Sequence, residues 1–296
     1  MNFRRFIRIC LFSALWIGAA VGQTSRPPCS QCAVWNTPQT PFRIFGNTYY
    51  VGPHGLSSIL ITSESGHVLI DGALPESAQQ IVANIRALGV RIEDVKLILS
   101  SHVHFDHAGG IAELQRLSGA RVVASPWSAA VLKSGGMGHG DPQYGILTPI
   151  QRVNHVDELH DGESFRVGGI AMTAHLTPGH TPGGTSWTWT SCEHDVCHDI
   201  VYADSLTPVS ADGFKFSKNR DYPSALNDFE KSFVFLETVH CDILLTTHPE
   251  ISELWERIKA RDQGIKPDPM VNSGACRQLA QRGRELLRQR LADEGK

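Results

Sequence analysis

Four side chains that can bind a metal ion occur within six residues of this sequence. The segment His102–His107 reads HVHFDH and comes directly after the apolar run Val95–Leu99. Imidazole nitrogens and carboxylate oxygens are ligands that zinc prefers in proteins. A single histidine in a loop is usually an exposed polar residue, but four potential ligands in so short a window are hard to explain without a metal. We therefore interpret this segment as the main part of a metal site.

Two further histidines lie in turns that are rich in Gly or Pro. His180 belongs to the sequence PGHTPGG and His248 to TTHPE, and each turn follows a strand-like run. Three histidines suit a tetrahedral zinc with one open position, and two histidines with a carboxylate suit a second zinc. We predict two zinc ions per chain. Their expected ligands are His102, His104 and His180 for one ion, and Asp106, His107 and His248 for the other.

The other nine histidines show no such grouping, and the sequence assigns them no role. They are His54, His67, His139, His155, His160, His175, His194, His198 and His240.

Strand-like and helix-like patterns in both halves of the chain would position these ligands. The predicted strands are Phe42–Phe45, Thr48–Val51, Ser57–Thr62, His67–Ile70, Val95–Leu99, Arg121–Ala124, Glu163–Val167, Ile170–Leu176, Thr185–Thr190, Ile200–Tyr202 and Ile243–Leu245. The predicted helices are Pro75–Leu88, Ile111–Leu117, Trp127–Lys133, Tyr222–Val239, Ile251–Arg261 and Gly274–Leu291. Ser134–Pro149 is expected to be a surface loop. This order predicts an α/β fold of layered sheets in two similar halves, with the ligands converging on one edge.

The N-terminus has the three-part pattern of a secretory signal peptide. Three arginines precede the apolar run Ile9–Val21, and Ala20 and Gly22 would occupy positions −3 and −1 of a cleavage before Gln23. An uncleaved membrane anchor is the alternative, but the run is too short to span a membrane comfortably. We expect a signal peptide over residues 1–22, a loosely tied arm over 23–41 and a single domain over 42–296. Export would place the protein in the periplasm, with no membrane association after cleavage.

The cysteine count supports export. Cleavage would remove Cys10 from the seven cysteines and leave an even number, which indicates disulfides in an oxidising compartment. The pairing stays open from sequence alone. Cys192 with Cys197 could close a tight loop, and Cys241 with Cys276 could join a C-terminal helix to a strand end. Cys29 and Cys32 could form half of a zinc site, but they lack a second pair nearby, so a local disulfide is favoured.

Composition narrows the class of protein. With 41% apolar and 19% charged residues among 296, the chain is expected to be a soluble globular protein rather than collagen-like, coiled-coil or disordered. A net charge of −3 gives no reason to expect a nucleic-acid partner. We expect a small-molecule substrate. We also expect a monomer, because no pattern in the sequence indicates an oligomer.

The His-x-His-x-Asp-His pattern resembles the signature of the metallo-β-lactamase superfamily. The resemblance covers nearly the whole chain from Phe42 to the last helix. It implies a four-layer αβ/βα sandwich with a dinuclear zinc cleft at the edge between two β-sheets. Within the superfamily, the sequence looks most like class B, subclass 3 (B3), which has a serine where other subclasses place a cysteine ligand. Here the corresponding stretch is Tyr202–Thr207 (YADSLT), and the Cys241–Cys276 pair also matches a disulfide typical of that subclass.

The same stretch contains an ambiguity. Related thioester and lactone hydrolases use an aspartate here as a carboxylate that bridges both metals. Adjacent residues on a strand point to opposite faces, so only one of Asp204 and Ser205 can face the metals. The resemblance implies that Ser205 does so and that Asp204 turns away in a structural role.

The resemblance implies a zinc hydrolase that opens the β-lactam amide of penicillins, cephalosporins and carbapenems and so confers antibiotic resistance. A hydroxide bound to zinc would attack the ring. Asp106 would be the catalytic residue, ligating the second zinc and orienting that hydroxide. Ser205 and Thr207 would hydrogen-bond the substrate carboxylate, and Gln143 would contact substrate from the rim. Two alternatives stay open: another hydrolase of this fold, acting on a lactone, thioester or phosphodiester, and a non-catalytic zinc-binding protein.

Overall fold

A computed structural model of the chain describes residues 29–295. The predicted signal peptide over residues 1–22 and the first part of the predicted arm, residues 23–28, lie outside the described residues. From Gln31 onward the chain forms one compact unit. Within residues 29–295, no helix is both long enough and apolar enough to cross a lipid bilayer.

The first β-sheet has seven strands in the order β1-β2-β3-β4-β5-β6-β7. Strands β1 to β4 pair antiparallel, whereas β4 to β7 pair in parallel. Their bounds are β1 (Phe42–Phe45), β2 (Thr48–Tyr50), β3 (Ile59–Ile61), β4 (His67–Ile70), β5 (Val95–Leu99), β6 (Arg121–Ala124) and β7 (Val156–Glu158). The predictions for β1, β4, β5 and β6 are confirmed residue for residue, while β7 was not predicted.

The second β-sheet has five strands in the order β12-β11-β10-β9-β8. Strands β8 to β11 pair antiparallel, and β11 pairs with β12 in parallel. Their bounds are β8 (Ser164–Val167), β9 (Ile170–Leu176), β10 (Thr185–Glu193), β11 (Val196–Ala203) and β12 (Ile243–Thr246). The two halves are therefore less similar than the order of elements suggested, because β7 from the middle of the chain extends the first sheet.

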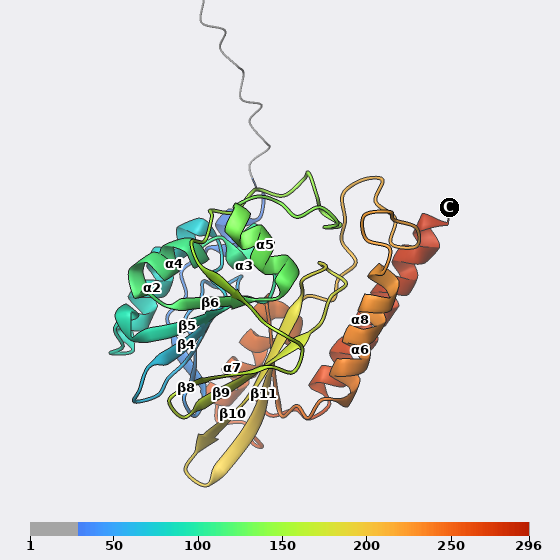
Figure 1. The fold of residues 1–296 in the computed structure, drawn as a ribbon. Coiled ribbons are helices and arrows are strands. Elements are labelled where there is room, and N and C mark those ends of the chain that lie inside the picture. Colours follow the sequence, from blue (N-terminus) through green and yellow to red (C-terminus); the bar gives the residue numbers. More distant parts are fainter. Residues whose placement is uncertain (1–28, 296) are drawn as a thin grey trace, which may run out of the picture. The chain divides into compact units, whose positions relative to one another are not determined.

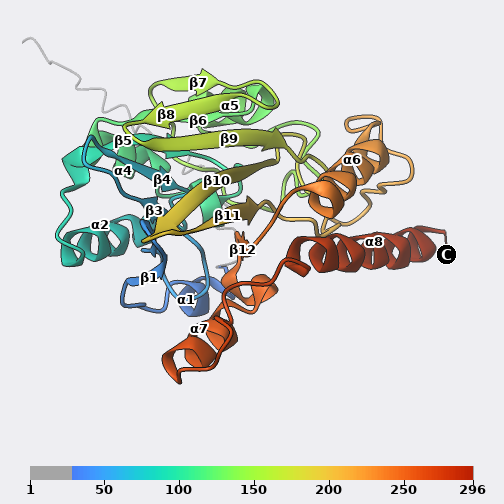
Figure 2. The ribbon, with the colours of Figure 1, turned by 90° about the horizontal axis from the view of Figure 1, so that it is seen from below.

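Helices cover the outer faces of the two sheets. Their bounds are α1 (Cys32–Trp35), α2 (Ala78–Ala87), α3 (Phe105–Ala108), α4 (Ile111–Ser118), α5 (Pro126–Ser134), α6 (Ala225–Thr238), α7 (Leu254–Asp262) and α8 (Ala275–Glu294), with 3₁₀ turns η1 (Pro75–Ser77), η2 (Ile92–Asp94) and η3 (Pro249–Ser252). Helices α2 and α4 lie beside the first sheet, and α6 and α8 lie side by side next to the second (Figures 1 and 2).

Three apolar cores separate four layers. In β5, Leu97 and Leu99 face the core between the two sheets, whereas Ile98 faces the core under the helices of the first sheet. In β11, Tyr202 belongs to the core between the sheets and Val201 to the core under α6 and α8. Strands buried on both faces read as continuous apolar runs, which is why β5 shows no polar alternation over its last three residues. The predicted αβ/βα sandwich is confirmed.

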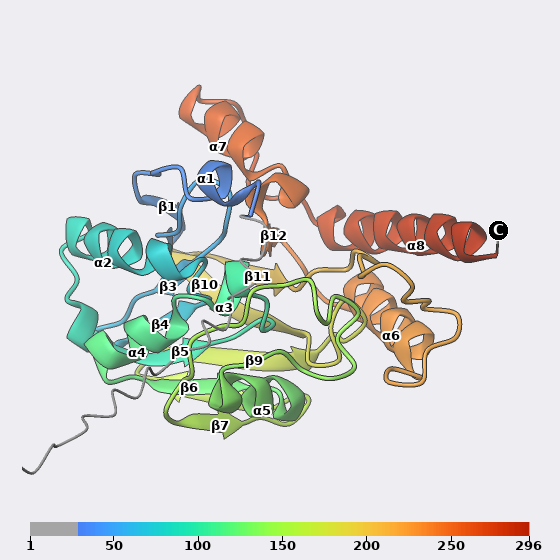
Figure 3. The same cartoon turned by 90° about the horizontal axis from the view of Figure 1, so that it is seen from above.

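Strand direction brings distant segments to one edge. Strand β10 is antiparallel to both β9 and β11, and β11 is parallel to β12, so β9, β11 and β12 all end at the same edge. The turns that contain His180, Ser205 and His248 follow these three strands. Helix α3, which follows β5, lies near the same edge in the view from above (Figure 3).

A buried carboxylate ties the two sheets together beneath this edge. Asp71 follows β4 with a positive φ of 59° and is fully buried. It accepts hydrogen bonds from the Ser101 backbone N–H at 2.8 Å, the Ser101 hydroxyl at 2.6 Å and the Tyr202 hydroxyl at 2.7 Å. Burial raises the pKa of Asp71, and the charge of His107 and these hydrogen bonds oppose that rise. The contact fixes the backbone just before the histidine-rich segment.

Two local predictions are wrong. The predicted helix Ile251–Arg261 is split into η3 and α7 at Glu253, whose φ of 55° is incompatible with a continuous right-handed helix. The described part of the predicted arm is also not loosely tied. The side chain of Asn84 donates to the Gln39 carbonyl at 3.0 Å, and Ser77 donates to Asn36 at 2.6 Å.

Replacing Tyr202 by Phe tests the buried tie. The variant keeps the aromatic ring but removes one donor to a buried charged acceptor, which costs about 1–3 kcal/mol of unfolding free energy. We expect this loss in urea unfolding of Y202F, followed by circular dichroism, with little change in Y49F, a half-buried tyrosine of β2. Equal stability of the two variants would contradict this role for Tyr202.

Candidate metal centre

The structure brings the first predicted ligand set together. The ligand atoms of His102, His104 and His180 all lie within 4.8 Å of one another, and the three residues are buried. His102 and His104 come from the loop after β5, and His180 comes from the turn after β9. Gly179 allows that turn, because its φ of 139° and its closeness to the ring of Phe229 exclude a side chain.

Each of these imidazoles has one ring nitrogen held by the protein. His102 Nδ1 lies 2.6 Å from an oxygen of Asp204, and His104 Nε2 lies 3.0 Å from an oxygen of Asp141. His180 Nδ1 lies 2.7 Å from the Thr207 carbonyl oxygen. Such contacts fix which nitrogen carries the proton and leave the other one as a ligand.

The second predicted set is also assembled. The ligand atoms of Asp106, His107 and His248 lie within 4.8 Å of one another. An oxygen of Asp106 is 3.2 Å from His107 Nε2 and 3.4 Å from His248 Nε2. Burial alone would raise the pKa of Asp106, but His107 and His248 hold it well below its usual range. Asp106 is therefore an ionised carboxylate at neutral pH.

The two sets are neighbours. The ring centroids of His102 and His107, one from each set, are 4.4 Å apart. Burial and the surrounding histidines keep the pKa of His102 well below its usual range, and burial lowers the pKa of His180 to about 3. These imidazoles are neutral at pH 7, which is the form that binds a metal.

The donor set fits zinc. The Nε2 atom of His102 is buried and has no hydrogen-bond partner among residues 29–295, although its Nδ1 atom is held. An unpartnered buried nitrogen beside two other imidazoles is unfavourable unless a ligand satisfies it. Three imidazoles in one set, and two imidazoles with a carboxylate in the other, match three-ligand zinc sites that keep a position open.

Both sets open into one cleft of about 290 Å³. The metal-ligand candidates on its wall are His104, Asp106, His107, His180 and His248. The predicted substrate contacts Gln143, Ser205 and Thr207 line the same cleft. Gln143 is only 8% exposed although it lies in the loop predicted to be at the surface, and its backbone N–H donates to Asp141 at 2.8 Å.

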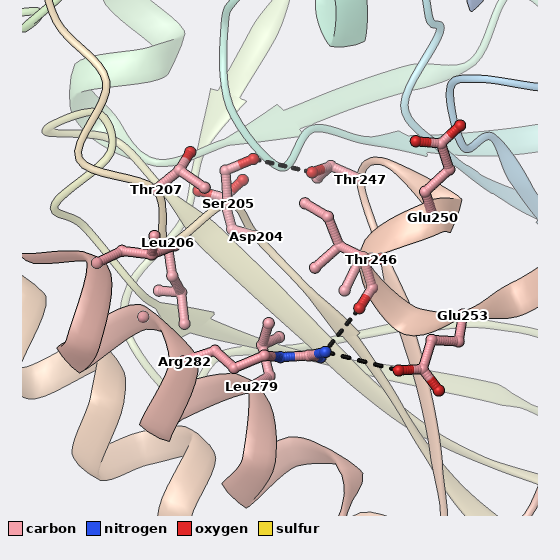
Figure 4. A pocket seen from close by; sticks show the side chains of 13 residues that line it. Asp204, Ser205, Leu206, Thr207, Thr246, Thr247, Glu250, Glu253, Leu279 and Arg282 are labelled. Carbon is pink, nitrogen blue, oxygen red and sulfur yellow. Dashed lines mark hydrogen bonds and ion pairs between the residues drawn. The ribbon is translucent and has the colours of Figure 1, made fainter.

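Asp204 and Ser205 point in different directions, as the sequence required. Asp204 contacts His102, whereas Ser205 lines the cleft, where its hydroxyl lies 2.9 Å from that of Thr247 (Figure 4). Ser205 and Thr207 also border a second cavity of about 280 Å³ beneath α8. Figure 4 shows Arg282 reaching across this second cavity toward Glu253.

Sequence reasoning missed two residues of the site. Asp141 holds His104, and the ring of Trp35 in α1 packs against His248 with centroids 5.3 Å apart. Neither residue stands out in the sequence, since an Asp before Pro reads as a turn and a single Trp in a polar segment has no periodicity. Their roles come from contacts between distant segments.

Two expected disulfides are present. Cys192 is bonded to Cys197 and Cys241 to Cys276. Cys29 and Cys32 are both in the disulfide form. A local Cys29–Cys32 bond stays a prediction.

Known proteins share this fold. The family described as the metallo-beta-lactamase superfamily matches residues 51–248. The chain belongs to this superfamily. Rm3 metallo-beta-lactamase is 56% identical to it, with a TM-score of 0.89 over 91% of this chain and 100% of that one. MEM-A1, a subclass B3 metallo-beta-lactamase from a soil metagenome library, is 50% identical, with a TM-score of 0.86 over 88% of this chain and 98% of that one. These likenesses place the chain among the B3 metallo-beta-lactamases.

Curated relatives outside this subclass are more distant. An N-acyl homoserine lactonase from Bacillus cereus is 27% identical over 154 residues, covering 43% of this chain and 55% of that protein. The chain spans about half the length of the curated relatives it matches.

Substitution of Asp204 tests the support of His102. Loss of such a carboxylate typically lowers metal affinity about 10–100-fold. We expect this loss in Asp204→Ala and a smaller one in Asp204→Asn, whose amide oxygen can still accept a hydrogen bond from Nδ1. Metal affinity is measured by competition with a chromophoric chelator.

Asp157→Asn is the matched control, because Asp157 is exposed and pairs only with Arg121 among the described contacts. It should bind metal like the unmodified chain. If Asp204→Ala also did so, Asp204 would not support the ligand.

The stability of the metal-free protein should depend on pH through His180. With a pKa of about 3 when folded and about 6.5 when unfolded, this imidazole binds more protons in the unfolded state between those values. Stability therefore falls as pH decreases from about 6.5 toward 3, by at most roughly 4–5 kcal/mol for this residue. Urea unfolding in chelator should show a weaker decrease for His180→Ala. Identical pH dependence in both proteins would contradict the assignment.

Proposed function

We propose that this chain hydrolyses the β-lactam amide bond of penicillins, cephalosporins and carbapenems with two zinc ions. The observation that carries the proposal is the pair of three-ligand sets that open into one cleft lined by Ser205, Thr207 and Gln143. Two solved structures that are 56% and 50% identical to this chain are named metallo-beta-lactamases.

The protein's own groups would hold the ions and prepare the cleft. His102, His104 and His180 would bind the first ion, and Asp106, His107 and His248 the second. Zinc bound there would supply Lewis acidity and a water acidified to a near-neutral pKa. As an ionised carboxylate at the cleft wall, Asp106 can also accept a proton or hydrogen bond and so orient the attacking nucleophile. This makes Asp106 the proposed catalytic residue.

Substrate would be positioned by polar groups opposite the histidines. The hydroxyls of Ser205 and Thr207 can donate to a carboxylate, the anionic group that β-lactam substrates carry. Thr207 is positioned for this because its carbonyl already binds His180 at 2.7 Å. Gln143 offers an amide from the opposite loop, and Asp141 orients its backbone.

Two alternatives make different demands on the site. A lactonase or thioesterase of this superfamily would be expected to use a bridging aspartate. Here the Asp204 carboxylate contacts His102 Nδ1 and does not line the cleft. A non-catalytic zinc protein would be expected to have closed four-ligand sites. Each set here has three protein ligands, which supports catalysis.

The proposal includes the setting of the enzyme. A signal peptide over residues 1–22 would direct export, and a single domain over 42–296 would act as a monomer in the periplasm. Disulfides Cys192–Cys197 and Cys241–Cys276 support an oxidising compartment. In that location the enzyme would destroy β-lactams before they reach their targets and confer resistance.

Hydrolysis assays test the proposed activity. The purified chain is incubated with nitrocefin, a penicillin, a cephalosporin and a carbapenem, with an N-acyl homoserine lactone as comparison. We expect turnover of all four β-lactams that chelator abolishes and zinc restores. Zinc-loaded protein that opened the lactone but no β-lactam would overturn the proposal.

Asp106→Ala tests the catalytic assignment. The variant removes a ligand of the second set. Loss of a residue that only hydrogen-bonds a metal ligand typically lowers activity roughly 10–100-fold, so kcat/KM for nitrocefin should fall by more than that. Asp157→Asn should retain full activity. A nearly normal rate in Asp106→Ala would refute the role of this carboxylate.

A further inference from the structure

A second cluster of side chains that could bind a metal lies at the other end of β11 and β12. Asp199 is in the first half of β11, and His240 and Asp242 immediately precede β12. The metal centre follows the opposite ends of these strands, after Ala203 and Thr246. The two places are therefore separated by the length of the paired strands, about 13 Å at 3.3 Å per residue.

The donors of this cluster are already close together. The ligand atoms of Asp199, His240 and Asp242 lie within 4.8 Å of one another. His240 Nδ1 is 2.7 Å from an Asp199 oxygen, and His198 Nδ1 is 3.4 Å from an Asp242 oxygen. The latter distance equals that between Asp106 and His248 in the metal centre, also 3.4 Å.

Covalent and hydrogen bonds hold the backbone that carries these donors. Cys197, before His198, is bonded to Cys192, and Cys241, between His240 and Asp242, is bonded to Cys276. Residues 199 and 242 also bond to each other: the Asp242 N–H donates to the Asp199 carbonyl at 2.9 Å, and the Asp199 N–H donates to the Asp242 carboxylate at 3.0 Å. Little further ordering of the backbone would be needed to bind an ion.

Two donor side chains are also oriented by neighbours. The Thr190 hydroxyl donates to one oxygen of Asp199 at 2.6 Å and leaves the other facing His240. The ring of His198 packs against Phe45, with centroids 4.7 Å apart.

We propose that Asp199, His240 and Asp242, with His198 beside them, bind a divalent transition-metal ion. Two carboxylates and one imidazole match a doubly charged cation, and an imidazole ligand favours zinc, nickel or copper over magnesium or calcium. The side chains of His240 and Asp199 are 74% and 41% exposed. This ion is consequently held more weakly than those of the metal centre and exchanges with solution.

The bound ion would join the starts of β11 and β12. An ion that binds the folded chain but not the unfolded chain stabilises the folded state by mass action. At a free zinc concentration ten times Kd, the unfolding equilibrium constant falls about 11-fold. Because the cluster is remote from the cleft, its loss leaves β-lactam turnover unchanged.

Equilibrium dialysis with elemental analysis tests this site. Tag-free protein is first dialysed against metal-free buffer, so that only tightly held zinc remains, and is then equilibrated with increasing zinc. We expect one additional zinc per chain in the unmodified protein, and its loss in His240→Ala and in Asp199→Asn. His160→Ala, which removes an exposed histidine elsewhere, is the matched control and should retain it.

Thermal unfolding of the same samples gives a second readout. Zinc added after the tight sites are filled should raise Tm in the unmodified protein and in His160→Ala, but not in His240→Ala. Equal zinc binding and equal Tm shifts in His240→Ala and the unmodified chain would overturn the proposal and leave only an ion pair at this surface. Tightly held zinc and nitrocefin turnover, measured on the same samples, separate this outcome from failure of the proposed activity.

Discussion

The buried carboxylate of Asp71 is the contact on which the rest of the site depends. It belongs to the first sheet, yet it accepts a hydrogen bond from Tyr202 in the second, and it holds Ser101 one residue before the first histidine. A buried carboxylate is costly unless donors surround it, so these hydrogen bonds favour the arrangement in which Ser101 and Tyr202 meet at Asp71. The same requirement places the loop after β5 against the ends of β9, β11 and β12.

The metal centre is built by the same means. Its imidazoles are buried, and burial favours their neutral form, as the low pKa values of His102 and His180 show. Asp204, Asp141 and the Thr207 carbonyl each bind one ring nitrogen and so aim the other at the site. These three acceptors come from the cleft loop and from the residues after β11. The segments that follow strands of the second sheet therefore contribute His180, Asp204 and Thr207 to the first ligand set and its support.

Strands β11 and β12 connect the proposed catalytic centre with the proposed second metal site. They are neighbours in a parallel pair, so both their starts and their ends lie together. At the ends, the two largely buried ligand sets open into the cleft, to which η3 contributes Ile251. At the starts, two disulfides hold the partly exposed cluster of Asp199, His240 and Asp242, in which we propose a metal-binding role for His240.

Much of this protein could be predicted from its sequence, because the information is local. The ligand types and their spacing in HVHFDH, after the apolar run of β5, predict the fold and four members of the two ligand sets. The Gly- and Pro-rich turns after strand-like runs predict the other two, His180 and His248. Other features depend on segments far apart in the chain. His102 and Asp204 are separated by 102 residues, and Trp35 reaches His248 through α1. These contacts depend on the tertiary structure, because strand direction and register determine which turns share an edge of the sheets. The residues next to a position in the sequence do not determine that arrangement.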